Sequence, residues 1–367
     1  MPGDIKLRPK LADVARQAGV SPATASRVLT GSARVRPETR QQVEAAIAHL
    51  GYVRNRAPRA SASRGTGSIA FMVCEDNARV FSEPFFPLML RSVSRELSAR
   101  GIQLVLLTAH SPRDYQIASR YLRSGHVDGA LLVSMHGKRP LDLRSLGVPV
   151  LLAGRSFGND EGISYVDADN AGGAKMAVEY LLKSGRTMIA TIAGPPDMAP
   201  GADRLAGYRA AMNEAGLTDP GLIVFGDFGR VSAEHGLYRL LDRRPGIDAV
   251  FAASDLMAAG VCGALRRIGR RVPDDIAVIG FDDSPLAQHT DPKLTTVRQP
   301  VEAMGARMAA ELLALIARGG QQPAHIILDT ELVIRDSTSP GHDPPIAGSH
   351  RPLPRPGSPP GPVRVLA

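Results

Sequence analysis

The spacing of hydrophobic positions along the chain changes near residue 68. Before this point, residues 11–50 show the periodicity of three short helices. The first helix is predicted over Leu11–Ala18 and ends at Gly19. The second is capped by Ser21 and runs over about Pro22–Leu29, and the third runs over Pro37–Leu50. This pattern predicts a small all-α domain.

From residue 68 onward, short apolar runs alternate with amphipathic helices. The βαβα order predicts parallel sheets that are covered on both faces. The length of this region favours two doubly wound lobes with a cleft between them, and such clefts bind small molecules. Strands are expected at residues 69–73, 102–107, 129–133, 149–153, 163–169, 187–193, 248–253 and 276–281, and helices at Phe86–Arg100, Tyr115–Ser124, Asn170–Ser184, Asp203–Ala215, Ser232–Leu241 and Asp255–Ile268.

The last segment has a different composition. Residues 340–367 contain nine prolines. Such a segment cannot hold a helix and has little to bury, so a disordered tail is expected. The predicted organisation is a headpiece at residues 8–54, a hinge segment at 55–67, a two-lobed core at 68–339 and the tail at 340–367.

The positive charge is concentrated at one end of the chain. Residues 1–67 hold twelve Lys and Arg against four Asp and Glu, which gives +8. The whole chain also has a net charge of +8, so the remainder is neutral. Arg-rich composition alone would not exclude acidic residues from one end. The distribution predicts a domain that binds a polyanion, attached to a neutral domain.

Other features exclude several classes of protein. Two distant cysteines, Cys74 and Cys262, exclude a disulfide framework and fit a reducing compartment. No apolar run is long enough for a membrane span, and no signal peptide is recognisable, so a cytoplasmic location is expected. The chain shows no metal-ligand pair such as HExxH, no P-loop and no nucleophile–base pair. Neither an enzyme nor a bound metal or cofactor is therefore expected.

Many positions of the N-terminal segment match one known family in register. The matching residues are Asp13-Val14-Ala15, Ala18-Gly19-Val20-Ser21, Thr24, Ser26-Arg27-Val28-Leu29, Val35, Thr39-Arg40, Val43, Ala46 and Leu50-Gly51-Tyr52. The segment resembles the DNA-binding headpiece of the lactose/galactose repressor (LacI/GalR) family. The resemblance implies a helix-turn-helix whose second helix lies in the major groove of DNA.

This resemblance implies a set of DNA contacts. Pro22, Ala23 and Arg27 would face base edges, with Arg27 on a guanine and the first two limited to apolar contacts. Ser21 and Thr24 have a simpler alternative as helix caps, and Arg27 as a solvated surface arginine. The remaining predicted contacts, which include those to phosphates, are Leu11, Ser21, Thr24, Ser26, Arg34 and Thr39.

The segment after the third helix departs from the family pattern. Tyr52 and Asn55 match the family's exit into a short hinge helix that enters the minor groove, but Ser61 replaces the usual leucine wedge and Pro58 a usual alanine. Serine is a poor apolar wedge, so we expect a weaker or different kink in the DNA. Arg59 and its neighbouring arginines can compensate through phosphate or minor-groove contacts.

The rest of the chain resembles the same family's regulatory core, which is built like periplasmic sugar-binding proteins. The matching segments are residues 127–130, 166–170, 204–208, 226–228, 254–255, 279–283 and 294–300. By this resemblance Arg204 opens a helix and holds the effector with two hydrogen bonds, Asp282 is its acidic partner, Phe228 is an aromatic platform and Gln299 lies in the cleft. Plain alternatives are an Arg204–Asp282 salt bridge and core packing of Phe228. Further cleft residues would be Phe81, Phe85, Phe86, Ser134, Arg155 and Ser254.

The sequence therefore predicts a homodimeric transcriptional regulator, most simply a repressor. It would bind double-stranded operator DNA, and a small-molecule effector, favoured to be a mono- or oligosaccharide, would switch its DNA affinity. Two alternatives remain open at this stage. The same fold can take a purine or nucleoside, and a solute-binding protein would share the core but lack the basic headpiece.

Overall fold

A computed structural model describes residues 11–29, 35–50, 65–137, 141–156, 162–319, 323–338 and 363–365. The chain divides into two compact units, residues 1–62 and 63–367. The first unit contains the predicted headpiece, and the second contains the predicted core.

Three helices form the headpiece, as the sequence predicts: α1 (Leu11–Gln17), α2 (Pro22–Leu29) and α3 (Pro37–Leu50). The Ser21 hydroxyl caps α2 by accepting a hydrogen bond from the Thr24 backbone N–H at 3.1 Å. This cap satisfies one of the N–H groups that a helix start leaves without a partner. One apolar face of each helix is turned inward, and the fully buried side chains are Val14, Ala15, Ala25, Val28, Val43 and Ala46.

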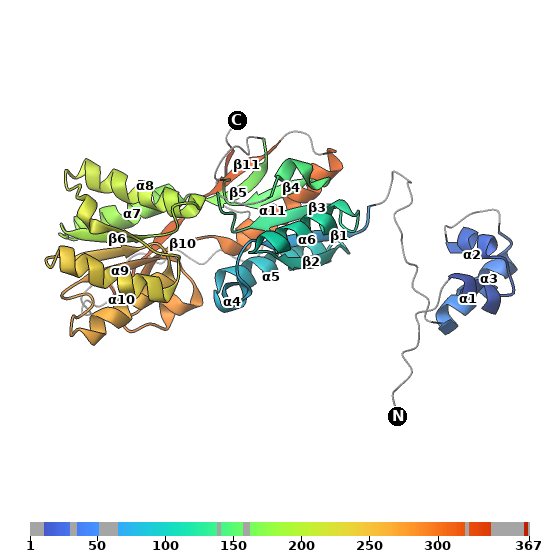
Figure 1. Ribbon diagram of the computed structural model, residues 1–367, viewed down its shortest axis with the longest axis horizontal. Coiled ribbons are helices and arrows are strands. Elements are labelled where there is room, and N and C mark those ends of the chain that lie inside the picture. Colours follow the sequence, from blue (N-terminus) through green and yellow to red (C-terminus); the bar gives the residue numbers. More distant parts are fainter. Residues whose placement is uncertain are drawn as a thin grey trace, which may run out of the picture. The chain divides into compact units, whose positions relative to one another are not determined.

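The core contains two sheets, and strands that are consecutive in the chain mostly run parallel, as predicted (Figure 1). The first has the order β13-β11-β5-β4-β3-β1-β2, and the second has the order β12-β10-β9-β8-β6-β7. Among the strands that the structure describes, only the pairs β10–β12 and β11–β13 are antiparallel. The strands are β1 (Ser68–Val73), β2 (Gln103–Thr108), β3 (Gly129–Val133), β4 (Val150–Ala153), β5 (Ser164–Ala168), β6 (Ile189–Ala193), β7 (Ile223–Phe225), β8 (Ala249–Ala252), β9 (Ala277–Asp282), β10 (Thr295–Arg298), β11 (His325–Leu328), β12 (Glu331–Val333) and β13 (Val363–Val365).

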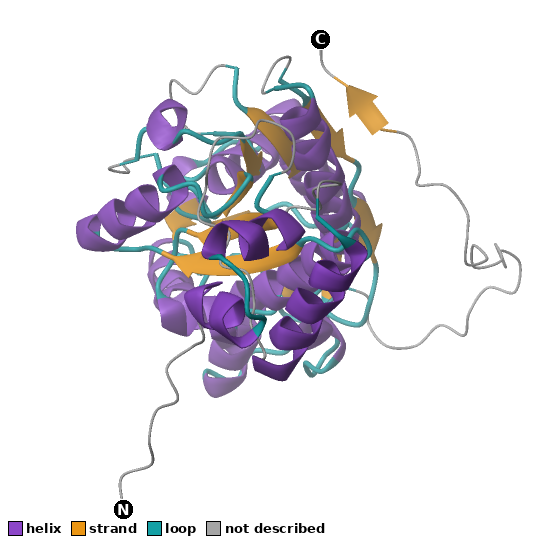
Figure 2. Cartoon of the chain, turned by 90° about the vertical axis from the view of Figure 1, so that its right-hand side faces the viewer, coloured by secondary structure: helices purple, strands orange, loops and turns teal. Residues whose placement is uncertain are grey.

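Helices cover both faces of each sheet, and Figure 2 shows the strands enclosed by them. In the first lobe, one apolar cluster joins the sheet to α5 and α11, and a second joins its other face to α6. In the second lobe, α7 and α8 lie on one face and α9 and α10 on the other (Figure 1). The helices are α4 (Asn77–Ser82), α5 (Phe85–Ser98), α6 (Pro112–Arg123), α7 (Asn170–Lys183), α8 (Ala199–Glu214), α9 (Arg230–Arg243), α10 (Asp255–Arg267) and α11 (Val301–Ala317).

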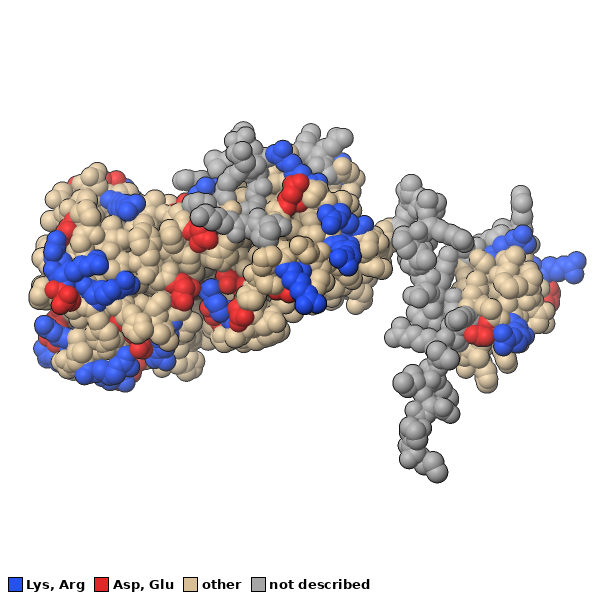
Figure 3. Space-filling view, in the orientation of Figure 1, with Lys and Arg blue, Asp and Glu red and all other residues tan. Residues whose placement is uncertain are grey.

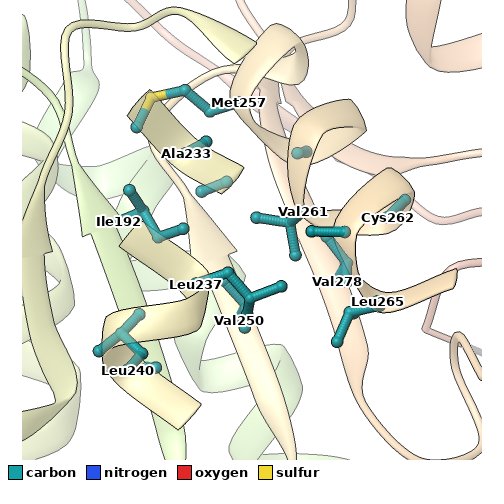
Figure 4. Close-up of a cluster of buried hydrophobic side chains, with 14 of the residues drawn as sticks. Ile192, Ala233, Leu237, Leu240, Val250, Met257, Val261, Cys262, Leu265 and Val278 are labelled. Atoms are coloured by element: carbon teal, nitrogen blue, oxygen red, sulfur yellow. The ribbon is translucent and has the colours of Figure 1, made fainter. Parts of the chain in front are cut away.

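Dense apolar packing fixes the second lobe. Figure 4 shows Leu237 of α9 and Val261 of α10 converging on Ile192, Val250 and Val278 of the sheet, and all five are fully buried. Close packing of this kind makes a lobe move as a rigid body rather than deform.

Up to β12 the chain passes between the lobes three times, after β5, after β10 and between β11 and β12, and β13 then belongs to the first lobe again. α11 and β11 therefore belong to the first lobe although they follow strands of the second. The predicted elements did not include α4, β7, α11 or the strands from β10 onward. α8 begins at Ala199, four residues before the predicted start, because Pro200 is compatible with a first helical turn.

Within the predicted tail, Val363–Val365 pair with β11, and the rest of the tail lies outside the described residues.

Candidate functional site

A cavity lies between the two lobes at the carboxyl ends of their strands, the usual place for a ligand in parallel α/β folds. The cavity is open to solvent and is lined by residues of both lobes. Nine of the ten predicted effector residues line it: Phe85, Phe86, Ser134, Arg155, Arg204, Phe228, Ser254, Asp282 and Gln299.

Phe81 does not take its predicted place. It lies on α4 with 69 % of its surface exposed and does not line the cavity. Phe81 is near the end of α4, whereas Phe85 and Phe86 begin α5, so the two sets of rings lie on different helices.

Arg204 is the central buried cation of the cavity. It lies in the second turn of α8 and does not open the helix, contrary to the prediction. Its Nε donates to Asn170 Oδ1 at 2.9 Å, and its Nη1 donates to the Ala253 carbonyl at 2.6 Å. The guanidinium also stacks on Phe281, 3.7 Å from the ring centroid. Burial lowers the pKa of Arg204, while nearby carboxylates act in the opposite direction.

Asp282, the last residue of β9, is the acidic partner of Arg204. Its Oδ1 accepts from Arg204 Nη1 at 3.4 Å and from Gln299 Nε2 at 2.6 Å. The predicted alternative of a salt bridge is therefore realised, within the same cavity wall. Burial raises the pKa of Asp282, and the charge of Arg204 partly offsets this rise.

A second carboxylate, Asp255, lies behind this pair at the start of α10. It accepts from Thr296 Oγ1 at 2.5 Å and from the Ser284 N–H at 2.7 Å. Burial, followed by the charge of Asp282, raises the pKa of Asp255 to about 8. Asp255 and Asp282 thus form a buried acidic pair that titrates in a coupled way.

The sequence reasoning missed Asp167 and Asn170, which connect β5 to α7. Asp167 accepts from Asn170 Nδ2 at 2.9 Å and from the Arg155 N–H at 2.8 Å. Asn170 in turn accepts from Arg204. One polar chain thus runs from the first lobe through a crossover into the second. The signal in the sequence was the Val-Asp-Ala-Asp-Asn segment at residues 166–170, which was noted without a role for each residue.

Phe228 presents an aromatic ring to the cavity. Its backbone has a positive φ of 67°, and its carbonyl accepts from Ser254 Oγ at 3.0 Å. A Cβ on Gly194 would overlap the Phe228 ring, so this glycine allows the ring to lie against the backbone. Phe228 also packs on the edge of the apolar core, so both predicted roles of this ring are compatible.

Backbone strain gathers around the cavity. Among the described residues, four non-glycine positions have positive φ, and Ser134, Phe228 and Asp282 of these line the cavity. Such conformations cost of order 1–3 kcal/mol each and are concentrated at functional sites. Gly154, also on the wall, has a φ of 89° that a side chain would disfavour.

The first lobe adds a charged wall. Glu75 is buried and accepts from Ser134 Oγ at 2.7 Å and from Arg79 Nη1 at 3.0 Å. Arg79 also donates to Glu83 at 2.7 Å, and burial raises the pKa of Glu83. Arg79 and Glu83 line the cavity, although they were not in the predicted set.

In the headpiece, α2 presents the predicted reading face. Pro22, Ala23 and Arg27 are exposed, whereas Ala25 and Val28 on the opposite side are buried. Of the other predicted DNA contacts, Ser21 is exposed, Thr24, Ser26 and Thr39 are half-buried, and Leu11 packs against the headpiece core. Arg34, Tyr52, Asn55, Arg59 and Ser61 lie outside the described residues.

Among the described residues, the charged side chains of the core surface form no single-sign patch on the face shown. Figure 3 shows acidic and basic side chains interspersed on the visible face of the core, in line with its neutral composition. Within the described ranges, no cluster of His, Cys, Asp and Glu could hold a metal ion, and no helix is long and apolar enough to cross a membrane.

Comparison with known proteins gives two family matches. Residues 10–55 match "Bacterial regulatory proteins, lacI family", and residues 178–338 match "Periplasmic binding protein-like domain". The chain is 46 % identical to the HTH-type transcriptional regulator CelR of Thermobifida fusca over 334 residues, which is 90 % of this chain and 98 % of that protein. The chain belongs to the lacI family of bacterial regulatory proteins.

Other regulators are similar to this chain over the same share of its length, with different identities. The ribose operon repressor of Halalkalibacterium halodurans is 32 % identical, over 90 % of this chain and 97 % of its own. A solved complex of the regulator CelR with cellobiose is 44 % identical, with a TM-score of 0.72 over 90 % of this chain and all of that one. A lac repressor dimer bound to operator and the anti-inducer ONPF is 26 % identical, with a TM-score of 0.74 over 90 % of this chain and 99 % of that one.

These findings confirm the predicted family, the two-part fold and the regulatory function. This lacI-family member is a DNA-binding transcriptional regulator, and its relatives are regulators and not enzymes.

Proposed function

We propose that this chain is a cytoplasmic repressor that binds operator DNA as a homodimer and is controlled by a disaccharide of the cellobiose type bound in its cleft. The observation that carries the proposal is the contrast within the cavity. Arg204, Asp282 and Gln299 form one compact polar cluster, and most other walls are apolar.

This contrast suits a sugar. A carboxylate and an amide side by side can bind neighbouring hydroxyls, and the guanidinium supplies further donors in a fixed orientation. The rings of Phe85, Phe86 and Phe228 offer flat surfaces to the C–H face of a pyranose. Further apolar walls come from Leu88, Met198, Leu256, Leu286, Val301 and Met304. A largely apolar cavity with polar groups on the walls of both lobes is consistent with a ligand of two rings.

The similarity to the regulator solved with cellobiose supports this choice of sugar. In the proposed mechanism, the effector changes the arrangement of the rigid lobes, and this change alters the fit of two headpieces on a near-palindromic operator. A coupling free energy of about 1–3 kcal/mol between the two sites is expected.

A DNA-binding titration tests the proposal. The full chain is first footprinted on DNA from upstream of its own gene, and its affinity for the protected duplex is measured with and without cellobiose. Glucose and adenine serve as comparison ligands. A change in affinity with cellobiose alone supports the proposal, and a response to adenine alone favours a purine effector. No response to any of them, with normal operator binding, contradicts a disaccharide effector.

The variant Arg27→Ala tests the DNA-binding face in the same assay. Loss of a base contact should weaken binding to the footprinted duplex by about 1–3 kcal/mol and relax the sequence preference at one base pair. Arg16→Ala is the matched control, because Arg16 is 79 % exposed and lies on α1. Arg16→Ala should change the affinity for all duplexes by the same factor. Equal preference profiles for the two variants would contradict a reading role for Arg27.

A further inference from the structure

A histidine outside the polar cluster of the cavity connects the two lobes. His136 follows β3 of the first lobe, and its Nδ1 lies 3.0 Å from Oδ2 of Asp197, in the β6–α8 loop of the second lobe. The Gly137 N–H also donates to the Asp197 carbonyl at 2.7 Å. On its other side, His136 Nε2 lies 3.3 Å from Glu75 Oε1 within the first lobe.

This arrangement selects one protonation state. Both ring nitrogens face a carboxylate, and only the imidazolium form can donate from both. A neutral ring would turn a lone pair toward one of the two acids. The hydrogen bond to Glu75 is the largest effect that raises the pKa of His136 above its ordinary 6.5, followed by the bond to Asp197, and burial opposes both.

His136 is connected to the cavity through Glu75. Glu75 accepts from Ser134 and Arg79, and Arg79 donates to Glu83. Ser134, Arg79 and Glu83 all line the cavity. An effector that contacts Ser134, Arg79 or Glu83 therefore touches groups that hold Glu75, and Glu75 in turn contacts His136.

We infer that His136 is a positioning residue that holds the two lobes closed around the effector, so that effector affinity depends on its protonation. The inference rests on the proposed function only in that an effector binds in this cleft. It adds a regulated contact between the lobes to the proposed site.

The direction of the pH effect follows from the contacts. Opening the lobes removes Asp197 and leaves His136 with Glu75, so the pKa of His136 is higher in the closed state. The contribution to closure is then fully present below the pKa of the open state and is lost as pH rises through that of the closed state. Effector affinity should fall from mildly acidic to mildly alkaline pH.

Other charged groups around this contact also contribute to the pH dependence of effector affinity, and their contributions must be distinguished from that of His136. Arg79 and Glu83 of the α4 region act on Glu75, and behind the cavity wall burial raises the pKa of Asp255 to about 8. Variants of His136 keep these groups, so only the difference between wild type and variant reports on the histidine. Another bridge between the lobes, from Arg155 to Asp203, involves an arginine that stays charged over this range.

A histidine titration of the effector-free full chain tests the geometry without any ligand. Selectively labelled histidine is followed by NMR, with His136→Gln to assign the signal. The wild-type pKa is expected above 6.5, and Asp197→Asn should lower it. A His136 pKa at its ordinary value, unchanged in Asp197→Asn, would overturn the inference.

Calorimetric titration with cellobiose tests the link to the effector. Wild-type affinity should fall by roughly threefold to tenfold between about pH 6 and about pH 8.5, and His136→Gln should lose most of this dependence. His110→Gln is the matched control, because His110 also lies between two carboxylates, Asp76 at 3.9 Å and Asp114 at 3.5 Å, all in the first lobe. The cellobiose affinity of this variant should depend on pH as that of wild type does.

If cellobiose affinity depends on pH equally in wild type and His136→Gln, His136 does not couple protonation to effector binding. Absence of cellobiose binding at every pH would instead refute the proposed effector, while the NMR titration would still decide whether His136 joins the lobes.

Discussion

Arg204 is held in place by contacts within the protein itself. Asn170, the Ala253 carbonyl and Asp282 fix its guanidinium, and the Phe281 ring supports it from one side. A donor group that is already oriented loses little conformational freedom when a ligand binds. The cavity is therefore preorganised at its polar end.

The substitution Arg204→Ala should remove the response to cellobiose and leave operator binding intact. Loss of hydrogen bonds from a charged group is worth about 1.5–3 kcal/mol, or roughly a tenfold to a hundredfold weaker affinity for the sugar. Arg209→Ala, an exposed arginine on the same helix, should bind as wild type does. Calorimetry measures both, with circular dichroism to show that the variants are folded. Unchanged cellobiose affinity in Arg204→Ala would exclude this role.

At this scale, local motifs were enough to predict the residues that line the cleft but not how they are connected. Arg204, Asp282, Phe228 and Gln299 were predicted because each lies in a short recognisable segment. The partners of His136 were not predictable, because Glu75 and Asp197 are each 61 positions away in the sequence. Such pairs meet only when two separate strand ends are brought together by the fold.

At the scale of secondary-structure elements, Gly207 of α8 allows the backbones of α7 and α8 to come close together. A Cβ on Gly207 would overlap the Ala171 carbonyl oxygen and come within 2.9 Å of the Lys175 nitrogen. Backbone atoms cannot move aside as the end of a side chain can. Gly263, in the middle of α10, has a different environment, because its nearest neighbour is the Arg230 Nη2 atom at 3.8 Å.

Alanine at positions 207 and 263 should therefore change the free energy of unfolding in opposite directions. Gly207→Ala should lower the free energy of unfolding by about 1–3 kcal/mol, as overpacking does. Gly263→Ala should raise it by roughly 0.5–1 kcal/mol, because alanine favours a helix over glycine. Urea unfolding of the full chain, followed by circular dichroism, measures both changes. Similar effects at both sites would show that the α7–α8 approach is looser than described.

The periodicity of the sequence predicted most of these elements, and their start and stop residues agreed best where Gly, Ser or Pro marked them. The assignment of α11 to a lobe had no such signal. Its place in the chain, after β10, favours the second lobe, and only its packing against α5 and the first sheet puts it in the first. Tertiary contacts, not local preference, decide this.

The molecule as a whole separates its two functions into two units with different charge. The headpiece region carries the net positive charge, and the core is neutral and contains the cavity. Among the described residues, the headpiece core contains six buried side chains, whereas the lobes have four larger clusters. The two units should therefore unfold separately.

Scanning calorimetry of the full chain should show two transitions, with only the core transition shifted by cellobiose. A ligand at a hundred times its Kd stabilises the unit that binds it by about 2.7 kcal/mol, which corresponds to a Tm shift of roughly 5–10 °C for a core of this size. Operator DNA should instead shift the headpiece transition. A single transition, or equal shifts of both with cellobiose, would contradict independent unfolding of the two units.

The repeated passage of the chain between the lobes also matters while the protein is being made. β1 to β5 leave the ribosome early, but α11, which covers one face of their sheet, is synthesised only after nearly all of the second lobe. Until then the apolar face that will receive Met304, Met308 and Leu312 stays exposed on the nascent chain. The first lobe is therefore the part that most needs protection from aggregation during translation, and truncation before residue 301 should leave it unable to fold.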